Sequence, residues 1–225
     1  MATGQERPPA APTDATNGNP RTAVRRERTR QKLLVAARVV FERSGFHDAR
    51  LADIVNEAGV ATGTFYNYFD SKEQIFAELV KLVVADLVAH STDDTARDDP
   101  VAGIYAANRA YVEGYRRNAR IMTILVQIGK NIDVRELGLE VRGGFEDRIS
   151  RAIARWQENG LAYPDLDPIY AANALSYMLD RFLYEWTVLE IDYDQEKVIE
   201  TVSRLWVRGL GLERPVLKKP PRGSG

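Results

Sequence analysis

Hydrophobic residues recur every three or four positions along most of this 225-residue chain. That spacing is typical of helices that bury one face, and we find no segment with the two-residue alternation of a half-buried strand. The pattern therefore predicts an all-α protein. The expected helices cover residues 28–43, 51–58, 62–69, 71–90, 101–117, 119–127, 134–159, 169–190 and 198–210. Gly138, Gly143 and Gly144 favour a kink or a break in the longest of them, because each glycine weakens a helix by about 1 kcal/mol relative to alanine.

Residues 51–69, LADIVNEAGVATGTFYNYF, predict two short helices joined by a tight turn. Gly59 follows the last apolar position of the first helix, and a glycine there permits the left-handed conformation that reverses the chain. In the second helix Phe65 and Phe69 are four residues apart, so both can face a core. The polar residues then fall on the outward side: Thr62, Thr64, Tyr66, Asn67 and Tyr68. Their hydroxyl and amide groups suit phosphate oxygens and base edges, which predicts a helix-turn-helix whose second helix enters a DNA groove.

The helix expected over residues 28–43 supplies a third wall for this small core. Its apolar stripe consists of Leu33, Leu34, Ala37, Val40 and Phe41. Gly45 stands where a left-handed cap would end the helix, and Phe46 can fold back on its last turn. Ser71 and Gln74 have the spacing of a capping box, which starts the next helix. We therefore expect an N-terminal three-helix domain over residues 21–71.

The net charge of −1 is unevenly distributed along the chain. Residues 21–50 hold nine Arg or Lys and three Asp or Glu, giving 9 − 3 = +6, so the remainder carries −1 − 6 = −7. A basic reading domain on an acidic body fits DNA binding, because phosphate neutralisation is local. The basic run 21–30 has two readings: a soluble helix start, or a flexible arginine arm that lies along phosphates or reaches the minor groove.

The segments Ala58-Gly59-Val60, GTFYNYF at 63–69 and DSKE at 70–73 resemble the DNA-binding signature of the TetR family of transcriptional regulators. The resemblance covers about residues 29–79. It implies an all-helical homodimer whose N-terminal domain binds a palindromic, double-stranded DNA operator. The C-terminal domain then holds a small-molecule inducer and the dimer interface. Residue types and resemblance together place the DNA contacts at Arg50, Thr62, Gly63, Thr64, Tyr66, Asn67, Tyr68 and Lys72.

Two positions depart from the family pattern. Ala61 stands where the family often has Ser, and Ala49-Arg50 stands where it often has Thr before the preceding helix. A missing side-chain cap costs about 1 kcal/mol of helix stability. One alternative therefore stays open: a helical small-molecule-binding protein of the same fold without operator function.

Residues 72–212 are expected to form the ligand-binding and dimerisation domain. Its last two helices are apolar on so many sides that a second copy of the chain would cover them, although burial inside one monomer is the alternative. Polar residues among apolar ones are the candidates for ligand contact: Tyr111, Gln127, Asn173, Tyr177 and Arg181. The aromatic and leucine-rich surroundings favour an apolar or amphipathic, lipid-like effector. RGGFEDRISRAIARWQ at 142–157 and GLAYPDLDP at 160–168 resemble actinobacterial TetR regulators of lipid or steroid metabolism.

Composition excludes several other classes. With no Cys and two His, the chain has little material for a metal centre, and no cofactor is expected. It has no Walker A, GxGxxG, GxSxG or HExxH motif, so an enzyme is not expected, although paired carboxylates on helices leave an all-helical enzyme as an alternative. No apolar run approaches the ~20 residues that span a bilayer, which favours a cytoplasmic protein. Residues 1–20 and 213–225 are expected to be disordered tails.

Overall fold

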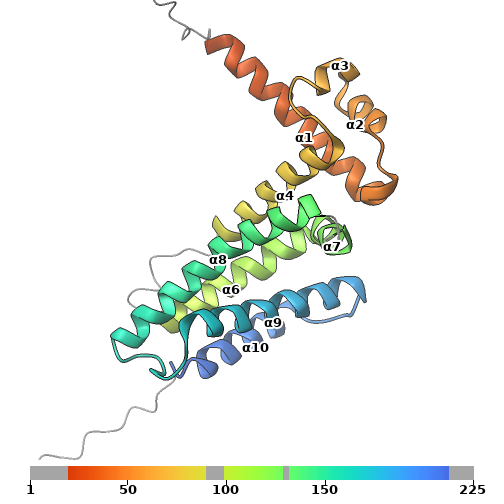
Figure 1. Cartoon of the computed structure of the whole chain (residues 1–225). Coiled ribbons are helices and arrows are strands. Elements are labelled where there is room, and N and C mark those ends of the chain that lie inside the picture. Colours follow the sequence, from red (N-terminus) through yellow and green to blue (C-terminus); the bar gives the residue numbers. More distant parts are fainter. Residues whose placement is uncertain (1–19, 90–98, 129–131, 213–225) are drawn as a thin grey trace, which may run out of the picture.

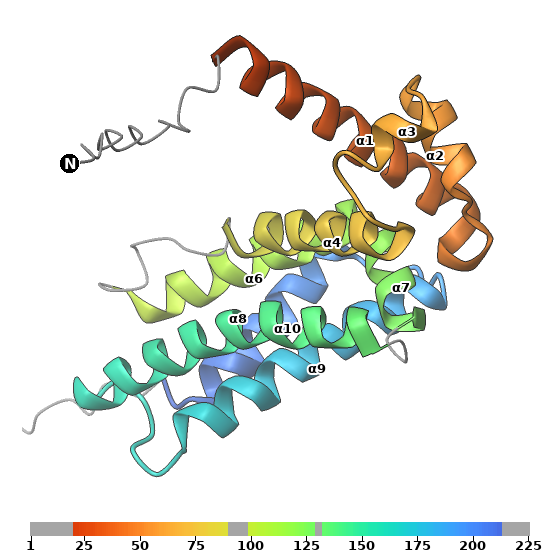
Figure 2. The same ribbon diagram turned by 45° about the horizontal axis from the view of Figure 1, so that its top comes forward.

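The computed structural model describes residues 20–89, 99–128 and 132–212. Every regular element within these ranges is an α-helix, which confirms the all-α prediction. The expected tails lie outside the described residues, apart from Pro20, and so do residues 90–98. Figures 1 and 2 show a small head of three helices joined to a larger helical body.

The head consists of α1 (Pro20–Asp48), α2 (Leu51–Ala58) and α3 (Thr62–Phe65). All five residues of the predicted stripe on α1 are buried, together with the inward residues of α2 and α3. The helix is longer than expected at its N-terminal end, where it begins at Pro20 instead of near residue 28. At Gly45 the backbone leaves helical geometry with φ 73° and ψ 178°, so the residue has the positive φ of the expected cap but an extended ψ. Phe46 does fold back, and its ring stacks on Phe41 at a centroid distance of 5.8 Å.

The second helix of the helix-turn-helix is shorter than the sequence suggests. It ends at Phe65, and Tyr66–Tyr68 form a turn in which the Tyr68 and Phe69 N–H groups both donate to the Phe65 carbonyl, at 2.9 and 3.0 Å. One helical turn is not stable alone, because nucleation costs more than a single turn of hydrogen bonds returns. Burial of Phe65 and Phe69 against the other two helices holds it in place.

The body contains six helices within the described ranges. They are α4 (Lys72–Ala89), α6 (Pro100–Arg117), α7 (Ala119–Ile128), α8 (Ile132–Glu158), α9 (Pro168–Val188) and α10 (Gln195–Gly209). Helix α8 packs along α9, α10 packs along α6, and α4 packs on both α6 and α8. Aspartates at the N-cap positions of α6, α9 and α10 accept hydrogen bonds from first-turn N–H groups, which explains where these helices begin: Asp99, Asp167 and Asp194. Helix α8 continues through Gly143 and Gly144, so the expected break there is wrong.

Helix α4 begins in the head and runs along the body, as Figure 1 shows. At its start the Gln74 N–H donates to Ser71 Oγ at 3.2 Å, as the predicted capping box requires, but the Gln74 side-chain oxygen accepts from the Asp70 N–H instead of the Ser71 N–H. Helix α1 also touches the body directly, against α4 and α7. The head is therefore attached through two helices, α4 by continuity and α1 by packing.

Candidate nucleic-acid interface and ligand-binding body

The turn between α2 and α3 sets the direction of the second helix. Gly59 adopts the left-handed conformation with φ 63° and ψ 41°. Its N–H donates to the Asn56 carbonyl at 3.1 Å, and the Val60 N–H donates to the Val55 carbonyl at 3.0 Å. These two bonds form a Schellman motif, which satisfies the last carbonyls of α2 and fixes where α3 starts.

The polar side of α3 and the following turn faces solvent. Thr62, Gly63 and Asn67 are exposed, and the Tyr66 side chain is 56% exposed. Nothing described lies within 4 Å of a Cβ built on Gly63, so the backbone there is open to close approach. Thr64 and Tyr68 are half-buried at the edges of the same surface. The monomer therefore leaves free the hydroxyl and amide groups that DNA contact requires.

The two positions that depart from the family pattern lie at helix starts without side-chain caps. Arg50 occupies the N-cap position of α2 and Ala61 that of α3, and within the described part of the chain neither makes a side-chain capping hydrogen bond. Arg50 is exposed. The first N–H groups of both helices are thus available to an anion, although the phosphate contact of Arg50 stays a prediction.

Lys72 makes structural contacts within the head that the sequence did not predict. Its ammonium group donates to the carbonyls of Phe46 at 2.8 Å, Ala49 at 3.0 Å and His47 at 3.4 Å. The nitrogen also lies 4.6 Å from the centroid of the Phe46 ring. Lys72 therefore ties the start of α4 to the end of α1. Its phosphate contact stays a prediction. An ammonium that also donated to a phosphate would do so in addition to, or in place of, these carbonyl contacts.

Arginines of α1 border the α3 surface. The Arg26 guanidinium lies over the Tyr68 ring at 5.9 Å from its centroid, and that of Arg30 lies over Phe69 at 5.7 Å. Arg30 also pairs with Glu78 of α4 at 2.5 Å. The middle of α1 is thus fixed beside the recognition turn by aromatic and ionic contacts.

The five candidate ligand residues do not form one cluster. Tyr111 is buried, and its hydroxyl donates to Asp180 at 2.5 Å while its ring stacks on Phe145. Asn173 is half-buried, with an amide oxygen that has no hydrogen-bond partner among the described residues. The other three are exposed on helix surfaces: Gln127, Tyr177 and Arg181.

The body instead contains a buried polar group centred on Asp180, which sequence reasoning missed. Burial raises the pKa of Tyr115 well above its ordinary value, and the negative charge of Asp180 raises it further. The Ser176 hydroxyl, one turn before Asp180, is buried with no hydrogen-bond partner in the described ranges. One signal was available: Asp180 is the first charged residue after an uncharged run over 169–179.

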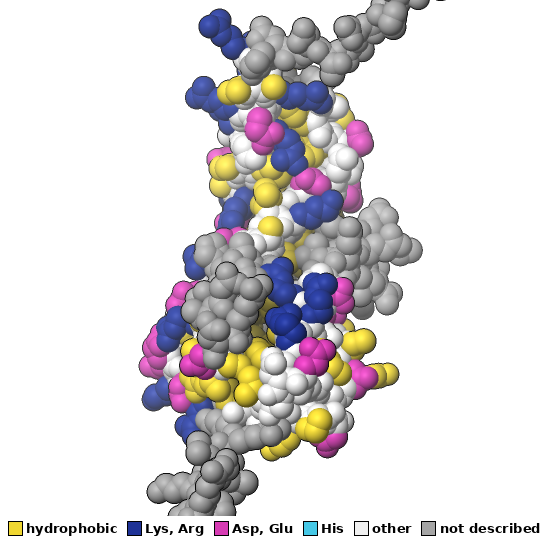
Figure 3. Space-filling view, turned by 90° about the vertical axis from the view of Figure 1, so that its left-hand side faces the viewer, with side chains coloured by type: hydrophobic (Ala, Val, Ile, Leu, Met, Phe, Trp, Pro, Cys, Tyr) yellow, Lys and Arg dark blue, Asp and Glu magenta, His cyan; other side chains and the backbone are white. Residues whose placement is uncertain are grey.

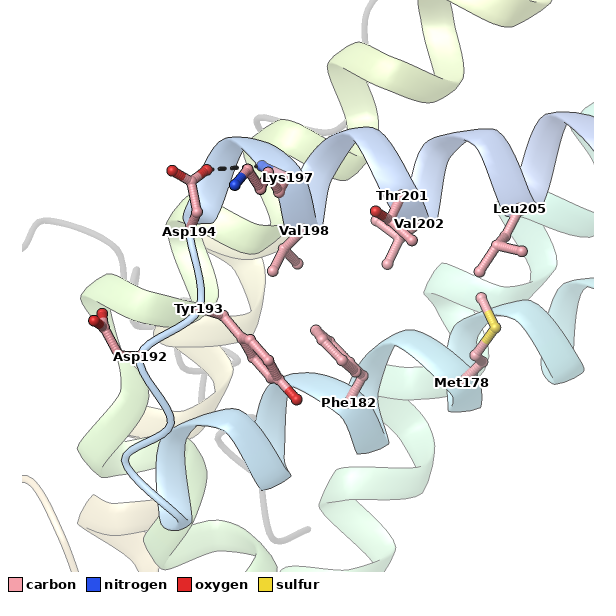
Figure 4. Close-up of a pocket in the computed structure, with 10 residues that line it drawn as sticks. All are labelled: Met178, Phe182, Asp192, Tyr193, Asp194, Lys197, Val198, Thr201, Val202 and Leu205. Atoms are coloured by element: carbon pink, nitrogen blue, oxygen red, sulfur yellow. Dashed lines mark hydrogen bonds between the residues drawn. The ribbon is translucent and has the colours of Figure 1, made fainter.

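An apolar groove of about 490 Å³ lies between α9 and α10, and Figure 4 shows its lining. The rings of Phe182 and Tyr193 stack at 5.5 Å on one side, and Val198, Val202 and Leu205 of α10 line the other. Large apolar side chains are exposed on α9, at its C-cap Leu189 and at one position of α10: Ile169, Tyr170, Tyr177, Met178, Val188, Leu189 and Leu205. The groove opens to solvent at the surface of the body.

A sequence profile for "Bacterial regulatory proteins, tetR family" matches residues 33–79, the segment that forms the head core and the start of α4. Residues 33–79 therefore carry the DNA-binding segment of the TetR family. The match includes α2, the Gly59 turn and α3, so the family signature coincides with the exposed polar surface described above.

TetR-family relatives extend the likeness over the body. The fatty acid metabolism regulator protein of Bacillus subtilis is 24% identical over 184 residues, which cover 80% of this chain and 94% of the relative. The helix-turn-helix transcriptional regulator YdgC of the same organism is 52% identical over 52 residues, 23% of this chain and 27% of its own. The crystal structure of the B. subtilis regulator FadR in complex with stearoyl-CoA has a TM-score of 0.70 at 21% identity, covering 80% of this chain and 98% of that one. At that identity the structural likeness shows the fold.

The described residues contain neither a group of metal-ligand side chains nor a membrane-spanning helix. Among the described residues no three His, Asp or Glu side chains are grouped as metal ligands would be. None of the helices described is both long enough and apolar enough to cross a membrane.

Proposed function

We propose that this protein is a ligand-responsive repressor that binds a palindromic operator as a homodimer and is released by a small apolar or amphipathic effector. The observation that carries the proposal is the outward polar face of α3: Phe65 and Phe69 are buried while Thr62, Tyr66 and Asn67 remain exposed. On this proposal Asn67 and the two threonines contact base edges or phosphates, and the tyrosine hydroxyls contact phosphates.

The apolar face of α9 and α10 supports a homodimer. A monomer that exposes this many large apolar residues on two adjacent helices would leave a patch of the kind that marks protein interfaces. A two-fold axis through such a face makes the interface self-complementary. The two heads would then present their α3 helices to half-sites about 34 Å apart, one turn of the duplex.

The proposed effector class is a long-chain acyl-CoA. Support comes from the relatives, one named for fatty acid metabolism and another solved with stearoyl-CoA. In this chain the body supplies an apolar interior with a few buried polar groups, including the unpaired Ser176 hydroxyl and Asn173 oxygen. That combination suits a ligand that is mostly hydrocarbon and has hydrogen-bonding groups.

The last two turns of α6 contact both the interior of the body and the two helices that hold the head. Tyr111 contacts Asp180 in the interior, and Gly114 lies so close to α4 that an added Cβ would be 3.0 Å from a Leu87 methyl group. At the helix end the Asn118 oxygen accepts from Arg38 of α1 at 2.8 Å, while the Asn118 amide donates to the Gly114 carbonyl at 2.9 Å. We propose that a ligand shifting α6 moves both head attachments together. The effect is limited to the ligand's affinity difference between the two states.

The experiment selects duplexes from a random-sequence pool with the full chain and then titrates the best duplex with stearoyl-CoA. We expect a palindrome to be enriched. Stearoyl-CoA should weaken binding about 5- to 150-fold, the usual range of allosteric coupling, whereas free coenzyme A should have no effect. Failure to enrich any sequence would contradict the operator proposal and favour a small-molecule-binding protein of this fold. An enriched palindrome that stearoyl-CoA does not release would contradict the effector class alone.

A further inference from the structure

Two buried oxygen atoms on α9 have no hydrogen-bond partner among the described residues. They are the hydroxyl oxygen of Ser176, a residue that is only 5% exposed, and the side-chain oxygen of Asn173. Residues three apart on a helix are neighbours on one face, so both atoms belong to the same side of α9. A buried polar group without a partner destabilises the folded protein, and a pair of them therefore requires an explanation.

Other polar side chains of the body do find partners. The buried amide of Asn108 donates to the Ser203 hydroxyl at 3.3 Å, across α6 and α10. On α9 itself the Thr187 hydroxyl donates to the Leu183 carbonyl one turn back, at 2.8 Å. Ser176 makes no such bond within the described ranges, so its hydroxyl is available to a molecule from outside the chain.

The unpaired atoms continue a polar row whose other end is already paired. Ser176 lies one turn before Asp180, and the Asp180 carboxylate accepts from the Tyr111 hydroxyl of α6. The Tyr111 ring in turn stacks on Phe145 of α8. Contacts with α6 and α8 therefore occupy the Asp180 end of the row, while the end nearer the start of α9 keeps its hydrogen-bonding capacity.

The unpaired end lies toward one extremity of the body. Figures 1 and 2 show α9 beginning at the end of the body opposite α7. From Pro168 to Ser176 the helix rises about 12 Å at 1.5 Å per residue. Figure 3 faces this end of the molecule and shows Lys and Arg side chains at the surface of the body beside apolar ones. An amphipathic ligand whose polar segment lies at Ser176 therefore has charged surface near one end and the apolar interior near the other.

The two atoms define the groups that a ligand must supply. An amide oxygen only accepts, so Asn173 needs a donor, whereas the Ser176 hydroxyl can donate or accept. A hydrocarbon chain offers neither kind of group, and an ionised carboxylate only accepts. The pantetheine arm of an acyl-CoA, in contrast, carries amide N–H groups and carbonyls along its length. A ligand with an amide-bearing segment thus fits the pair better than a free fatty acid does.

We propose that Asn173 and Ser176 bind the amide-bearing arm of the effector and thereby distinguish an acyl thioester of pantetheine from the free fatty acid. This inference rests on the proposed effector class and names two residues that determine it. Binding the arm gives both atoms a partner, so stability that the empty protein lacks is recovered when the ligand binds.

The test measures binding of stearoyl-CoA, stearoyl-pantetheine and stearate to the full chain without DNA, by isothermal titration calorimetry. Wild type should bind both thioesters more tightly than stearate. In Ser176→Ala and in Asn173→Leu the affinity for the thioesters should fall by about 5- to 100-fold, because a polar group of the ligand loses its partner on burial. The affinity for stearate should stay at the wild-type value in both variants.

Urea unfolding of the ligand-free protein separates this role from ordinary packing. Ser176→Ala removes a buried hydroxyl that has no described partner, so the urea midpoint should rise. Ser203→Ala is the matched control, since Ser203 is also buried but accepts from Asn108. Its urea midpoint should fall, while its affinity for the thioesters should match wild type.

Three results would contradict the inference. An unchanged thioester affinity in either Ser176→Ala or Asn173→Leu would overturn it and indicate that water satisfies the pair, while the effector class would stand. Equal losses of thioester and stearate affinity would also overturn it, because they would indicate a change in the shape of the body. Wild type that bound none of the three ligands would overturn both this inference and the effector class, leaving the operator proposal intact.

Discussion

The head and the body are built from the same kind of amphipathic helix, but they leave opposite surfaces uncovered. The head buries its phenylalanines and exposes hydroxyls, an amide and several arginines of α1. The body exposes the apolar face of α9 and α10 and buries polar side chains such as Asn108, Ser176 and Ser203. A bare polar face with positive charge suits a polyanion, whereas a bare apolar face suits another protein surface. In each region, the surface that the core leaves uncovered therefore indicates the kind of partner it binds.

The largest effect is expected from Phe65→Ala, because Phe65 is fully buried and holds a one-turn helix that cannot form alone. Removing a buried phenylalanine costs about 3–5 kcal/mol. Hydrogen exchange should show loss of protection in α2 and α3 with little change in α9. Leu183→Ala, at a fully buried body position, should show the reverse. Equal loss across both regions in either variant would mean that head and body unfold as one unit.

Leu205→Glu should disrupt the proposed dimer interface on α9 and α10. Leu205 is 51% exposed in the monomer, and a carboxylate there would have to be buried in the proposed dimer without a partner. We expect the dimer dissociation constant to rise at least 100-fold, about 3 kcal/mol, by analytical ultracentrifugation. Val126→Glu is the control, because Val126 is similarly exposed at 49% but lies on α7. A dimer that survives Leu205→Glu would contradict this interface.

Lys72→Ala tests the contact between the start of α4 and the end of α1, where the head joins the body. Because the ammonium holds three carbonyls at the end of α1, its loss should lower the free energy of unfolding by about 1–3 kcal/mol. Lys81→Ala should cost less than about 1 kcal/mol, since among the described residues Lys81 pairs only with Glu78, near the surface. Urea unfolding of both variants measures the difference. If Lys72→Ala weakened DNA binding without affecting stability, its main role would be phosphate contact.

The smallest effect concerns the buried polar group of the body. Burial raises the pKa of Tyr115, so the folded protein retains a proton that the unfolded chain releases near pH 10. The stability that comes from this protonated group is present below about pH 10 and is lost as the pH rises toward the folded pKa. Tyr115→Phe should therefore make stability fall less steeply above pH 10, by up to about 1.4 kcal/mol per pH unit.

Urea unfolding between pH 9 and 11 measures the slope for Tyr115→Phe. Tyr170→Phe, at a tyrosine that is 77% exposed, is the control and should follow wild type. A slope for Tyr115→Phe that matches wild type would mean that Tyr115 ionises alike in the folded and unfolded chains.

Most of the head could be predicted from the sequence because its geometry is local. Helical spacing assigned Leu33, Val40 and Phe65 to the core, and Gly59 marked the turn, all within fifty residues of one another. Two helix ends were missed there: the sequence does not show that α3 stops after one turn or that α1 starts at Pro20. The first depends on how Phe65 and Phe69 pack, which can override propensity at a helix end, whereas residues 21–28 are exposed and carry no apolar pattern that would mark the second.

The interior of the body could not be predicted in the same way. Periodicity says that α9 has a buried face, but it does not say which residue of α6 lies opposite Asp180. That pairing joins Tyr111 and Asp180, which are 69 positions apart in the chain. Of the five candidates chosen for polarity among apolar neighbours, three proved to be surface residues, because one helix pattern leaves the rotation of its neighbours undetermined.

The most direct test of the account measures how well the protein distinguishes the selected duplex from random DNA in wild type and in Asn67→Ala, by fluorescence anisotropy at one salt concentration. Loss of a base-edge contact should reduce that ratio by roughly 10- to 100-fold, or 1–3 kcal/mol, while binding to random DNA stays unchanged. Asn159→Ala, at the far end of α8, should leave the ratio at the wild-type value. An Asn67→Ala protein with an unchanged ratio would contradict the claim that the uncovered face of α3 reads DNA.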